Sequence, residues 1–228
     1  MPAPVVSVAN LRFGWGDAPC LDIAAFELAQ NEQVFLYGPS GSGKSTLLNL
    51  LAGVLVPRAG ELVVLGAALP QLAGAARDRF RADHLGLIFQ QFNLIPYLSV
   101  LDNVLLPCRF SARRRERAGD PRQTAARLLA HLDLDAALWT RRADTLSVGQ
   151  QQRVAAARAL IGAPELIVAD EPTSALDADR QDAFLDLLTR ECAASGATLV
   201  FVSHDRRLAA RFTRTLFLPG LNRAGAAP

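Results

Sequence analysis

The sequence predicts an α/β protein with a mostly parallel core sheet, an antiparallel β layer and a helical subdomain. Short apolar segments followed by amphipathic segments, as in residues 33–51 and 165–193, indicate parallel strands that alternate with helices. Near the N-terminus, residues 5–13 and 21–27 have strand character and are separated by the turn residues Gly14, Gly16 and Asp17. These two segments suit an antiparallel layer at the edge of the fold.

The composition indicates one substantial core. A chain of 228 residues that is 50% hydrophobic is long enough for a single packed α/β domain, and we expect one domain over residues 1–228. No apolar run reaches the roughly 18 residues of a membrane-spanning helix, and the N-terminus lacks the features of a signal peptide. A soluble, cytoplasmic protein is therefore expected. The net charge of +2 does not by itself indicate nucleic-acid binding.

The remaining elements follow from the same patterns. Strands are expected at residues 61–66 and 85–90, on either side of a helix between residues 72 and 81. Residues 93–142 lack strong strand signals, so we expect a helical insert that forms the helical subdomain together with the helix after Leu146. Further expected elements are strands at residues 165–170, 198–203 and 215–219 and a helix at residues 178–193.

The cysteines and the lysine are informative. The three cysteines are scattered and lack metal-ligand spacing, so each is expected to be a small core residue: Cys20, Cys108 and Cys192. Of the 24 basic residues only Lys44 is a lysine. A lysine retained among arginines suggests a position where a compact point charge is needed and a broad guanidinium does not serve.

Lys44 lies in a glycine-rich motif that we call the phosphate loop. Residues 38–46 read GPSGSGKST and match GxxxxGK[ST] between an expected strand and an expected helix. The glycines allow backbone N–H groups to converge on phosphate oxygens, Lys44 reaches the outer phosphates and the Ser45 hydroxyl ligates Mg²⁺. The candidate binding residues are Gly38, Pro39, Ser40, Gly41, Ser42, Gly43, Lys44, Ser45 and Thr46.

Two carboxylates follow the apolar strand at residues 166–169. Their place at the carboxyl end of a buried strand puts Asp170 and Glu171 at the edge where α/β sheets bind ligands. In a phosphoryl-transfer site, Asp170 would hold the Mg²⁺ shell and Glu171 would polarise the attacking water. The alternative is that the pair only caps the next helix, since residues 172–174 are a plausible helix start.

A second element suited to phosphate is the segment LSVGQQQRV, residues 146–154, which we call the signature segment. Ser147 is a good N-cap for the helix that follows, and a capped core helix is the simplest interpretation. That interpretation leaves unexplained why a serine hydroxyl, a glycine N–H and the positive end of a helix dipole gather at one point.

Five motifs in order resemble the ATP-binding subunit of ABC transporters over nearly the whole chain: GPSGSGKST, LIFQQFN, LSVGQQQRVAAARAL, LIVADEPTSALD and FVSHD. The resemblance implies a phosphate-loop ATPase of ABC type that uses ATP and Mg²⁺. It also implies an ATP-dependent head-to-tail homodimer, with each ATP between one subunit's phosphate loop and the partner's signature segment. An integral-membrane permease would hold the protein at the inner face of the membrane, with no nucleic-acid partner.

The resemblance also implies roles for single residues. Ser147, Gly149 and Gln150 would bind the partner's ATP, and Asp177 would lie at the dimer interface. Gln90 matches the glutamine that senses Mg²⁺ and the attacking water, and His204 matches the histidine that contacts the γ-phosphate. With Glu171 and Lys44, these two residues form the expected catalytic set.

For the aromatic residue that stacks on adenine, the resemblance points to Trp15. Phe13, two residues earlier on the same strand face, is the competing candidate, and Trp15 would then be a core residue at the strand end. His84 and His131 match no motif and are expected to be structural.

The sequence departs from the family pattern at Val148, which replaces the first glycine of LSGGQ and narrows the backbone options there. The arginine-rich residues 109–123 are either a solvated helical face or a surface for a permease or anionic lipid. Residues 88–107 are similar to ATPases of the lipoprotein-releasing and macrolide-export type, and a cell-division ATPase with a regulatory role is the alternative.

Other classes fit less well. A DNA-repair or chromosome-structuring ATPase would need a long heptad insertion between the phosphate loop and the signature segment. A translation-associated ATPase normally carries two such domains. A scaffold that binds ATP without hydrolysing it is disfavoured by Glu171 and His204.

Overall fold

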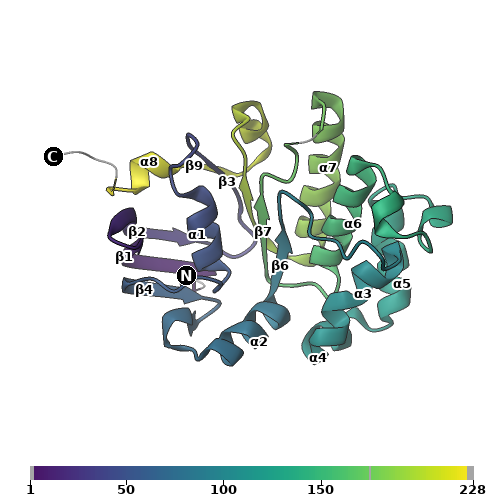
Figure 1. Ribbon diagram of the computed structural model, residues 1–228, viewed down its shortest axis with the longest axis horizontal. Helices are drawn as coiled ribbons and strands as arrows, with labels where there is room; N and C mark the ends of the chain where they lie inside the picture. Colours follow the sequence, from purple (N-terminus) through teal and green to yellow (C-terminus); the bar gives the residue numbers. More distant parts are fainter. Residues whose placement is uncertain (1–2, 175, 225–228) are drawn as a thin grey trace.

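The structure is a computed structural model that describes residues 3–174 and 176–224. At its centre is a five-stranded sheet with the order β6-β7-β8-β3-β9, in which every neighbouring pair is parallel. Figure 1 shows this sheet between the antiparallel layer and α1 on one side and a group of helices on the other. The strands are β3 (Gln33–Tyr37), β6 (Leu85–Ile88), β7 (Leu166–Asp170), β8 (Thr198–Val202) and β9 (Arg214–Phe217).

The antiparallel layer is a second sheet with the order β2-β1-β4-β5. It is formed by β1 (Val6–Trp15), β2 (Ala18–Leu28), β4 (Ala59–Val64) and β5 (Ala67–Ala68). The prediction of this layer is confirmed, although the strand expected at residues 61–66 ends at Val64. Leu65 and Gly66 have φ angles of 50° and 79°, so the backbone turns there and pairs back on itself as β5.

The helices occupy the expected regions of the chain. Residues 93–142 contain three helices, one 3₁₀ turn and no named strand, as predicted. No helix within residues 3–174 and 176–224 is both long and apolar enough to cross a membrane. The helices are α1 (Lys44–Leu51), α2 (Gly74–His84), α3 (Val100–Phe110), α4 (Ala112–Ala118), α5 (Pro121–His131), α6 (Val148–Leu160), α7 (Ala178–Ser195) and α8 (Leu218–Leu221), with 3₁₀ turns at Leu69–Gln71, Ala136–Leu138, Ala143–Thr145 and Arg206–Arg211.

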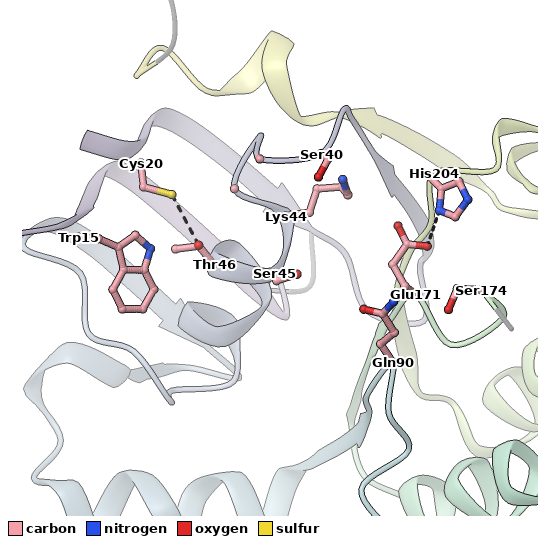
Figure 2. Close-up of a pocket in the computed structure, with 12 residues that line it drawn as sticks. Trp15, Cys20, Ser40, Lys44, Ser45, Thr46, Gln90, Glu171, Ser174 and His204 are labelled. Atoms are coloured by element: carbon pink, nitrogen blue, oxygen red, sulfur yellow. Dashed lines mark hydrogen bonds and ion pairs between the residues drawn. The ribbon is translucent and has the colours of Figure 1, made fainter. Parts of the chain in front are cut away.

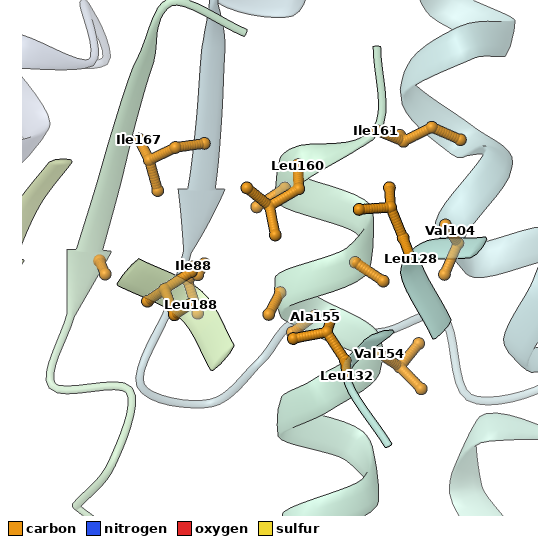
Figure 3. Packing of buried hydrophobic residues seen from close by; sticks show 14 of the residues in the cluster. Ile88, Val104, Leu128, Leu132, Val154, Ala155, Leu160, Ile161, Ile167 and Leu188 are labelled. Atoms are coloured by element: carbon orange, nitrogen blue, oxygen red, sulfur yellow. The ribbon is translucent and has the colours of Figure 1, made fainter. Parts of the chain in front are cut away.

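Side chains of the parallel strands alternate between two apolar cores. On β7, Ile167 faces the core that contains α6 and α7, whereas Val168 faces the core that contains α1 and the antiparallel layer. Burial of the sheet on both faces explains why its strands are nearly continuous apolar runs. In Figure 3, α6 lies between the sheet residues Ile88 and Ile167 on one side and Val104 and Leu128 on the other.

The end of the chain differs from the prediction. The strand expected at residues 215–219 ends at Phe217, and α8 begins at Leu218. Pro219 stands in the first turn of α8, where its missing N–H leaves no helical hydrogen bond unmade. The apolar run therefore continues, but with a change from strand to helix.

Arg114 fits neither alternative for residues 109–123, a solvated helical face or a surface for a permease or anionic lipid, because it lies inside the fold. Its side chain is only 2% exposed, and its guanidinium donates hydrogen bonds to the carbonyl oxygens of Leu85 (3.0 Å), Ala159 (2.6 Å) and Ile161 (2.8 Å). Burial lowers the pKa of Arg114 to about 10, so the group stays charged at neutral pH. Arg114 thus ties α4 to β6 and to the end of α6.

Neighbouring arginines in the same run pair with carboxylates. Arg113 and Arg117 each place a guanidinium nitrogen 2.5 Å from Oε1 of Glu165, and His84 Nδ1 lies 3.3 Å from Oε2. Burial alone would raise the pKa of Glu165, but the hydrogen bonds from His84 and Arg113 and the charge of Arg117 outweigh it and lower the pKa to about 2. His84 is therefore structural, as predicted, and His131 likewise contacts a carboxylate.

The lowered pKa of Glu165 predicts a pH-dependent contribution to stability. Because the folded pKa of about 2 lies below the ordinary value of 4.5, this contribution is present above pH 4.5 and is lost as the pH falls towards 2. We expect Glu165→Gln to lower the free energy of unfolding at pH 7 by about 1–2 kcal/mol, allowing for solvent screening of the arginines. Urea unfolding at pH values from 7 to 3 measures this loss of free energy, with a substitution of an exposed glutamate on α4, Glu116→Gln, as the control. An equal loss at both pH values would contradict the assignment.

Candidate functional site

Four neighbouring strands place the phosphate loop and the predicted catalytic residues at one edge of the parallel sheet. The phosphate loop joins β3 to α1, Gln90 follows β6, Asp170 ends β7 and His204 follows β8. The phosphate loop, Gln90, His204 and Glu171, the residue after Asp170, surround a cavity of about 570 Å³, shown in Figure 2. Its lining residues are Trp15, Cys20, Ser40, Gly41, Gly43, Lys44, Ser45, Thr46, Gln90, Glu171, Ser174 and His204.

The phosphate loop is held in a conformation that needs glycine. Gly43, the N-cap of α1, has a φ of 96°, and a Cβ atom there would lie 2.7 Å from Cδ2 of Leu21. The Lys44 ammonium folds back over the loop and donates hydrogen bonds to the carbonyl oxygens of Gly38 (2.8 Å) and Pro39 (3.0 Å). The loop therefore presents a positive charge and the N-terminus of α1 to the cavity, an arrangement suited to phosphate.

Glu171 and His204 form a pair on the side of the cavity opposite the phosphate loop (Figure 2). The His204 Nδ1 lies 2.9 Å from Oε2 of Glu171, and this pair is partly exposed to solvent. The backbone of Glu171 is left-handed, with a φ of 47°, and its N–H donates to the carbonyl oxygen of Val202 (3.0 Å). The alternative that Asp170 and Glu171 only cap a helix is wrong, because α7 begins at Ala178 with Asp177 as its N-cap.

The predicted metal ligands have the chemistry that Mg²⁺ requires. Oδ1 of Asp170 is buried and has no hydrogen-bond partner among the residues that the structure describes. Ser45 and Gln90 line the cavity, as does Glu171, the residue after Asp170. The described residues contain no group of three acidic, histidine or cysteine side chains for a metal. One carboxylate with hydroxyl, amide and substrate phosphate oxygens is the ligand set that Mg²⁺ takes in phosphoryl-transfer sites.

Of the two aromatic candidates for adenine, the structure exposes Trp15 to the cavity. Its side chain is 58% exposed and lines the cavity, whereas Phe13 is 9% exposed and packs in the core. The two rings meet edge to face with centroids 5.1 Å apart. The interpretation of Trp15 as a core residue is therefore wrong, and its indole is available to a planar ligand.

Two residues of the cavity were missed at the sequence level. Cys20 was expected in the core, as Cys108 and Cys192 are, but it is half-buried in the cavity wall with its thiol 3.5 Å from Oγ1 of Thr46. Ser174 also lines the cavity. Cys20 lies outside every motif, whereas Ser174 lies within LIVADEPTSALD, although that motif implied no role for it.

The signature segment and Asp177 do not line this cavity. Ser147 caps α6 in a reciprocal arrangement: Gln150 N–H donates to Ser147 Oγ (3.4 Å), and Ser147 N–H donates to Gln150 Oε1 (2.9 Å). Gly149 and Val148 follow in the first turn of α6, and Val148 is 46% exposed with a φ that is not positive. Val148 therefore has an ordinary helical conformation, which a β-branched residue can adopt. Within one chain the two phosphate elements are separate.

A glycine-rich loop at the carboxyl edge of a parallel sheet, opposite a glutamate–histidine pair, defines a phosphate-loop ATPase. A family model described as "ABC transporter" matches residues 21–174. The chain therefore belongs to the ABC transporter family, in which it is an ATP-binding and ATP-hydrolysing subunit.

Two curated relatives match nearly the whole chain. The ABC transporter ATP-binding protein YbbA of Escherichia coli (strain K12) is 42% identical over 223 residues, covering 96% of both chains. The lipoprotein-releasing system ATP-binding protein LolD 2 of Rhodospirillum rubrum is 40% identical over 222 residues, covering 96% of this chain and 95% of its own. The similarity expected from residues 88–107 is thus confirmed at the level of the ATP-binding subunit.

The fold is shared with a solved cassette. The dimeric structure of MJ0796, an ABC transporter cassette of Methanocaldococcus jannaschii, has a TM-score of 0.81 and 34% identity, covering 93% of both chains. A second structure of that cassette, a post-hydrolysis state bound to ADP and Pi, also has a TM-score of 0.81, with 35% identity and the same coverage. The predicted fold class is confirmed.

Proposed function

We propose that two copies of this chain close head to tail on two ATP molecules and that this closure drives a separate membrane permease. The observation that carries the proposal is the separation of the two phosphate elements: the signature segment lies outside the cavity that contains the phosphate loop. A second copy could bring the exposed, capped end of its α6 to that cavity, and the dimeric structure of the similar cassette MJ0796 supports such an assembly.

In each composite site, the base and the phosphates of ATP have distinct partners. Trp15 stacks on adenine, and the loop from Gly38 to Thr46 holds the triphosphate through its backbone N–H groups and Lys44. From the other subunit, Ser147 donates its hydroxyl, and Gly149 and Gln150 complete the contact at the γ-phosphate. Asp177, exposed at the start of α7, lies at the subunit interface.

The hydrolytic step uses Glu171 as the base. Its carboxylate orients the attacking water and accepts a proton from it, as the water attacks the γ-phosphate in line with the leaving oxygen. His204 holds the Glu171 carboxylate through Nδ1 and offers its other ring nitrogen to the γ-phosphate. Ser45, Asp170 and Gln90 would hold Mg²⁺, which when bound neutralises charge on the phosphate oxygens.

The permease partner is supported by an apolar groove beside the turn that carries Gln90. The groove has a volume of about 370 Å³, and its lining includes Phe89, Leu106, Pro107 and the exposed Phe110. An exposed apolar patch of this kind marks an interaction surface. A permease docked there would hold the chain at the inner face of the membrane and would contact the residue next to Gln90.

The similarity to LolD 2 favours a transporter of the lipoprotein-releasing type. A regulatory ATPase of the cell-division type, which moves no substrate, is the second candidate, because it would use the same site. No nucleic-acid partner is proposed.

A variant of Lys44 tests the assignment of the nucleotide site. We expect Lys44→Ala to weaken ATP binding about 10- to 100-fold, since a charge-assisted contact to phosphate is lost. Lys44→Arg is expected to weaken binding as well, because the guanidinium does not fit within a loop whose carbonyl oxygens accept from a compact ammonium. Calorimetric titration measures both, with the exposed Arg190→Ala as the control. ATP binding unchanged in Lys44→Ala would contradict the proposed site.

A further inference from the structure

The C-terminal segment, residues 218–224, lies against the outer side of the phosphate loop. Leu218 is fully buried in the core that contains α1, and Pro219 is so close to the loop that a Cβ atom on Gly38 would lie 3.0 Å from its Cδ. Figure 1 shows α8 near the antiparallel layer, at the end of the chain. The segment that follows α8 therefore approaches the nucleotide site from the outer side of the phosphate loop.

Asn222 is the residue of this segment with the most contacts to the site. Its Oδ1 accepts hydrogen bonds from the N–H groups of Asp22 (2.8 Å) and Ala224 (3.1 Å). Its Nδ2 donates to the carbonyl oxygens of Cys20 (2.9 Å) and Ser42 (3.4 Å). With donors on one side and acceptors on the other, only one orientation of the amide satisfies all four groups.

The bond to Ser42 bears on the direction of a loop N–H group. In a trans peptide the C=O and N–H bonds point in opposite directions, and the described residues contain no cis peptide. Holding the Ser42 carbonyl on the outer side of the loop therefore turns the Gly43 N–H to the opposite side. Because Gly43 lines the nucleotide cavity, an N–H turned away from the Ser42 carbonyl can point to the phosphate position.

The bond to Cys20 fixes the wall next to the base. Cys20 and Trp15 line the nucleotide cavity and also a second cavity of about 570 Å³ that is lined by Pro219 and Asn222. Asn222 thus lies behind the wall that joins the Trp15 side of the site to the phosphate loop. One amide group connects strand β2, the loop and the C-terminal segment.

We propose that Asn222 is a positioning residue that holds the phosphate loop and the cavity wall beside Trp15 in one fixed arrangement. The site then has its binding geometry before the nucleotide binds. The inference rests on the proposed nucleotide site. Its energetic basis is preorganisation: a loop fixed before binding loses less conformational freedom when the nucleotide binds. An apolar side chain at this position would make none of the four bonds, and an aspartate would face two carbonyl oxygens without a donor.

Two substitutions separate the donor from the acceptor. Asn222→Asp keeps the oxygen that accepts from Asp22 and Ala224 but loses both bonds to Cys20 and Ser42, whereas Asn222→Ala loses all four. Arg223→Ala is the control, because it removes an adjacent exposed ion pair with Asp22 and no contact with the loop. The affinity for ADP is measured by calorimetry, which avoids turnover, at about 0.5 M salt to screen the added charge of the aspartate.

We expect both Asn222 variants to bind ADP about five- to tenfold more weakly than the unaltered chain, and Arg223→Ala to bind it normally. In ATPase assays, KM for ATP should rise by the same factor while kcat stays within about twofold, since Glu171 and His204 are not contacted. A merely structural role would instead lower the active fraction, and so kcat, without changing KM.

The outcomes are distinct. If Asn222→Ala and Asn222→Asp both fold and both bind ADP within about twofold of the unaltered chain, the inference is wrong, whereas the proposed nucleotide site stands. If Asn222→Ala does not fold, Asn222→Asp alone decides in the same way. If the unaltered chain binds no ADP, or binds it equally well with Lys44→Ala, the proposed site fails and the inference with it.

Discussion

Replacing Glu171 by Gln is expected to lower ATP hydrolysis about 1,000-fold while ATP binding is retained, because a general base contributes about 100- to 10,000-fold. The amide keeps the size of the carboxylate but does not accept a proton from water. His204 loses its charged partner at 2.9 Å, although an amide oxygen can still accept from Nδ1. Since both subunits still bind ATP, the closed dimer should accumulate. Phosphate release and size-exclusion chromatography with ATP measure the two effects.

The matched control is Glu61→Gln, an exposed glutamate on β4 that lies away from the cavity. It should hydrolyse ATP at the rate of the unaltered chain. Normal turnover by Glu171→Gln would falsify the assignment of the base. Loss of ATP binding in that variant would instead show that Glu171 supports the structure of the site.

Mixing two inactive variants is expected to restore activity if the sites are composite. Lys44→Ala disables the phosphate loop of one chain, and Ser147→Arg disables the signature segment of the other by placing a bulky group where the partner's ATP binds. Each variant alone should lose hydrolysis about 1,000-fold, since neither forms an intact site. In a mixed dimer, one site has both an intact loop and an intact signature segment.

The expected recovery follows from symmetric pairing. In an equal mixture half of the dimers are mixed and each has one intact site, so activity should return to about one quarter of the unaltered level. The rate of ATP hydrolysis against the mixing ratio checks this, with Lys44→Ala mixed with Lys44→Ala,Ser147→Arg as the control that cannot recover. An unchanged, near-zero rate at every ratio would rule out the head-to-tail site.

Much of the fold was predictable because local patterns determine it. The alternation of apolar strands and amphipathic helices, as in β7 and α7, reflects burial of the sheet on both faces. Boundaries were less predictable where the backbone changes direction without a change in polarity. β4 ends at Val64 because Leu65 is left-handed, and β9 passes into α8 within one apolar run.

The site was predictable where chemistry requires a motif. The phosphate loop needs closely spaced glycines, and Asp170 and Glu171 stand out as acids after an apolar strand. The positions of Arg114, Cys20 and Asn222 were not predictable in this way. Each contacts a carbonyl oxygen or a hydroxyl of a distant segment. Because nearly every residue has the same backbone groups, the sequence does not show which of them a side chain will bond.

The left-handed backbone of Glu171 creates a conflict between ATPase activity and the stability of the fold. A residue with a side chain costs on the order of 1–3 kcal/mol in such a conformation, whereas glycine adopts it freely. A search among random variants for resistance to heat should therefore favour glycine at this position and discard the base that hydrolyses ATP. Heat-resistant variants that are selected without a screen for activity are therefore expected to bind ATP but not to hydrolyse it.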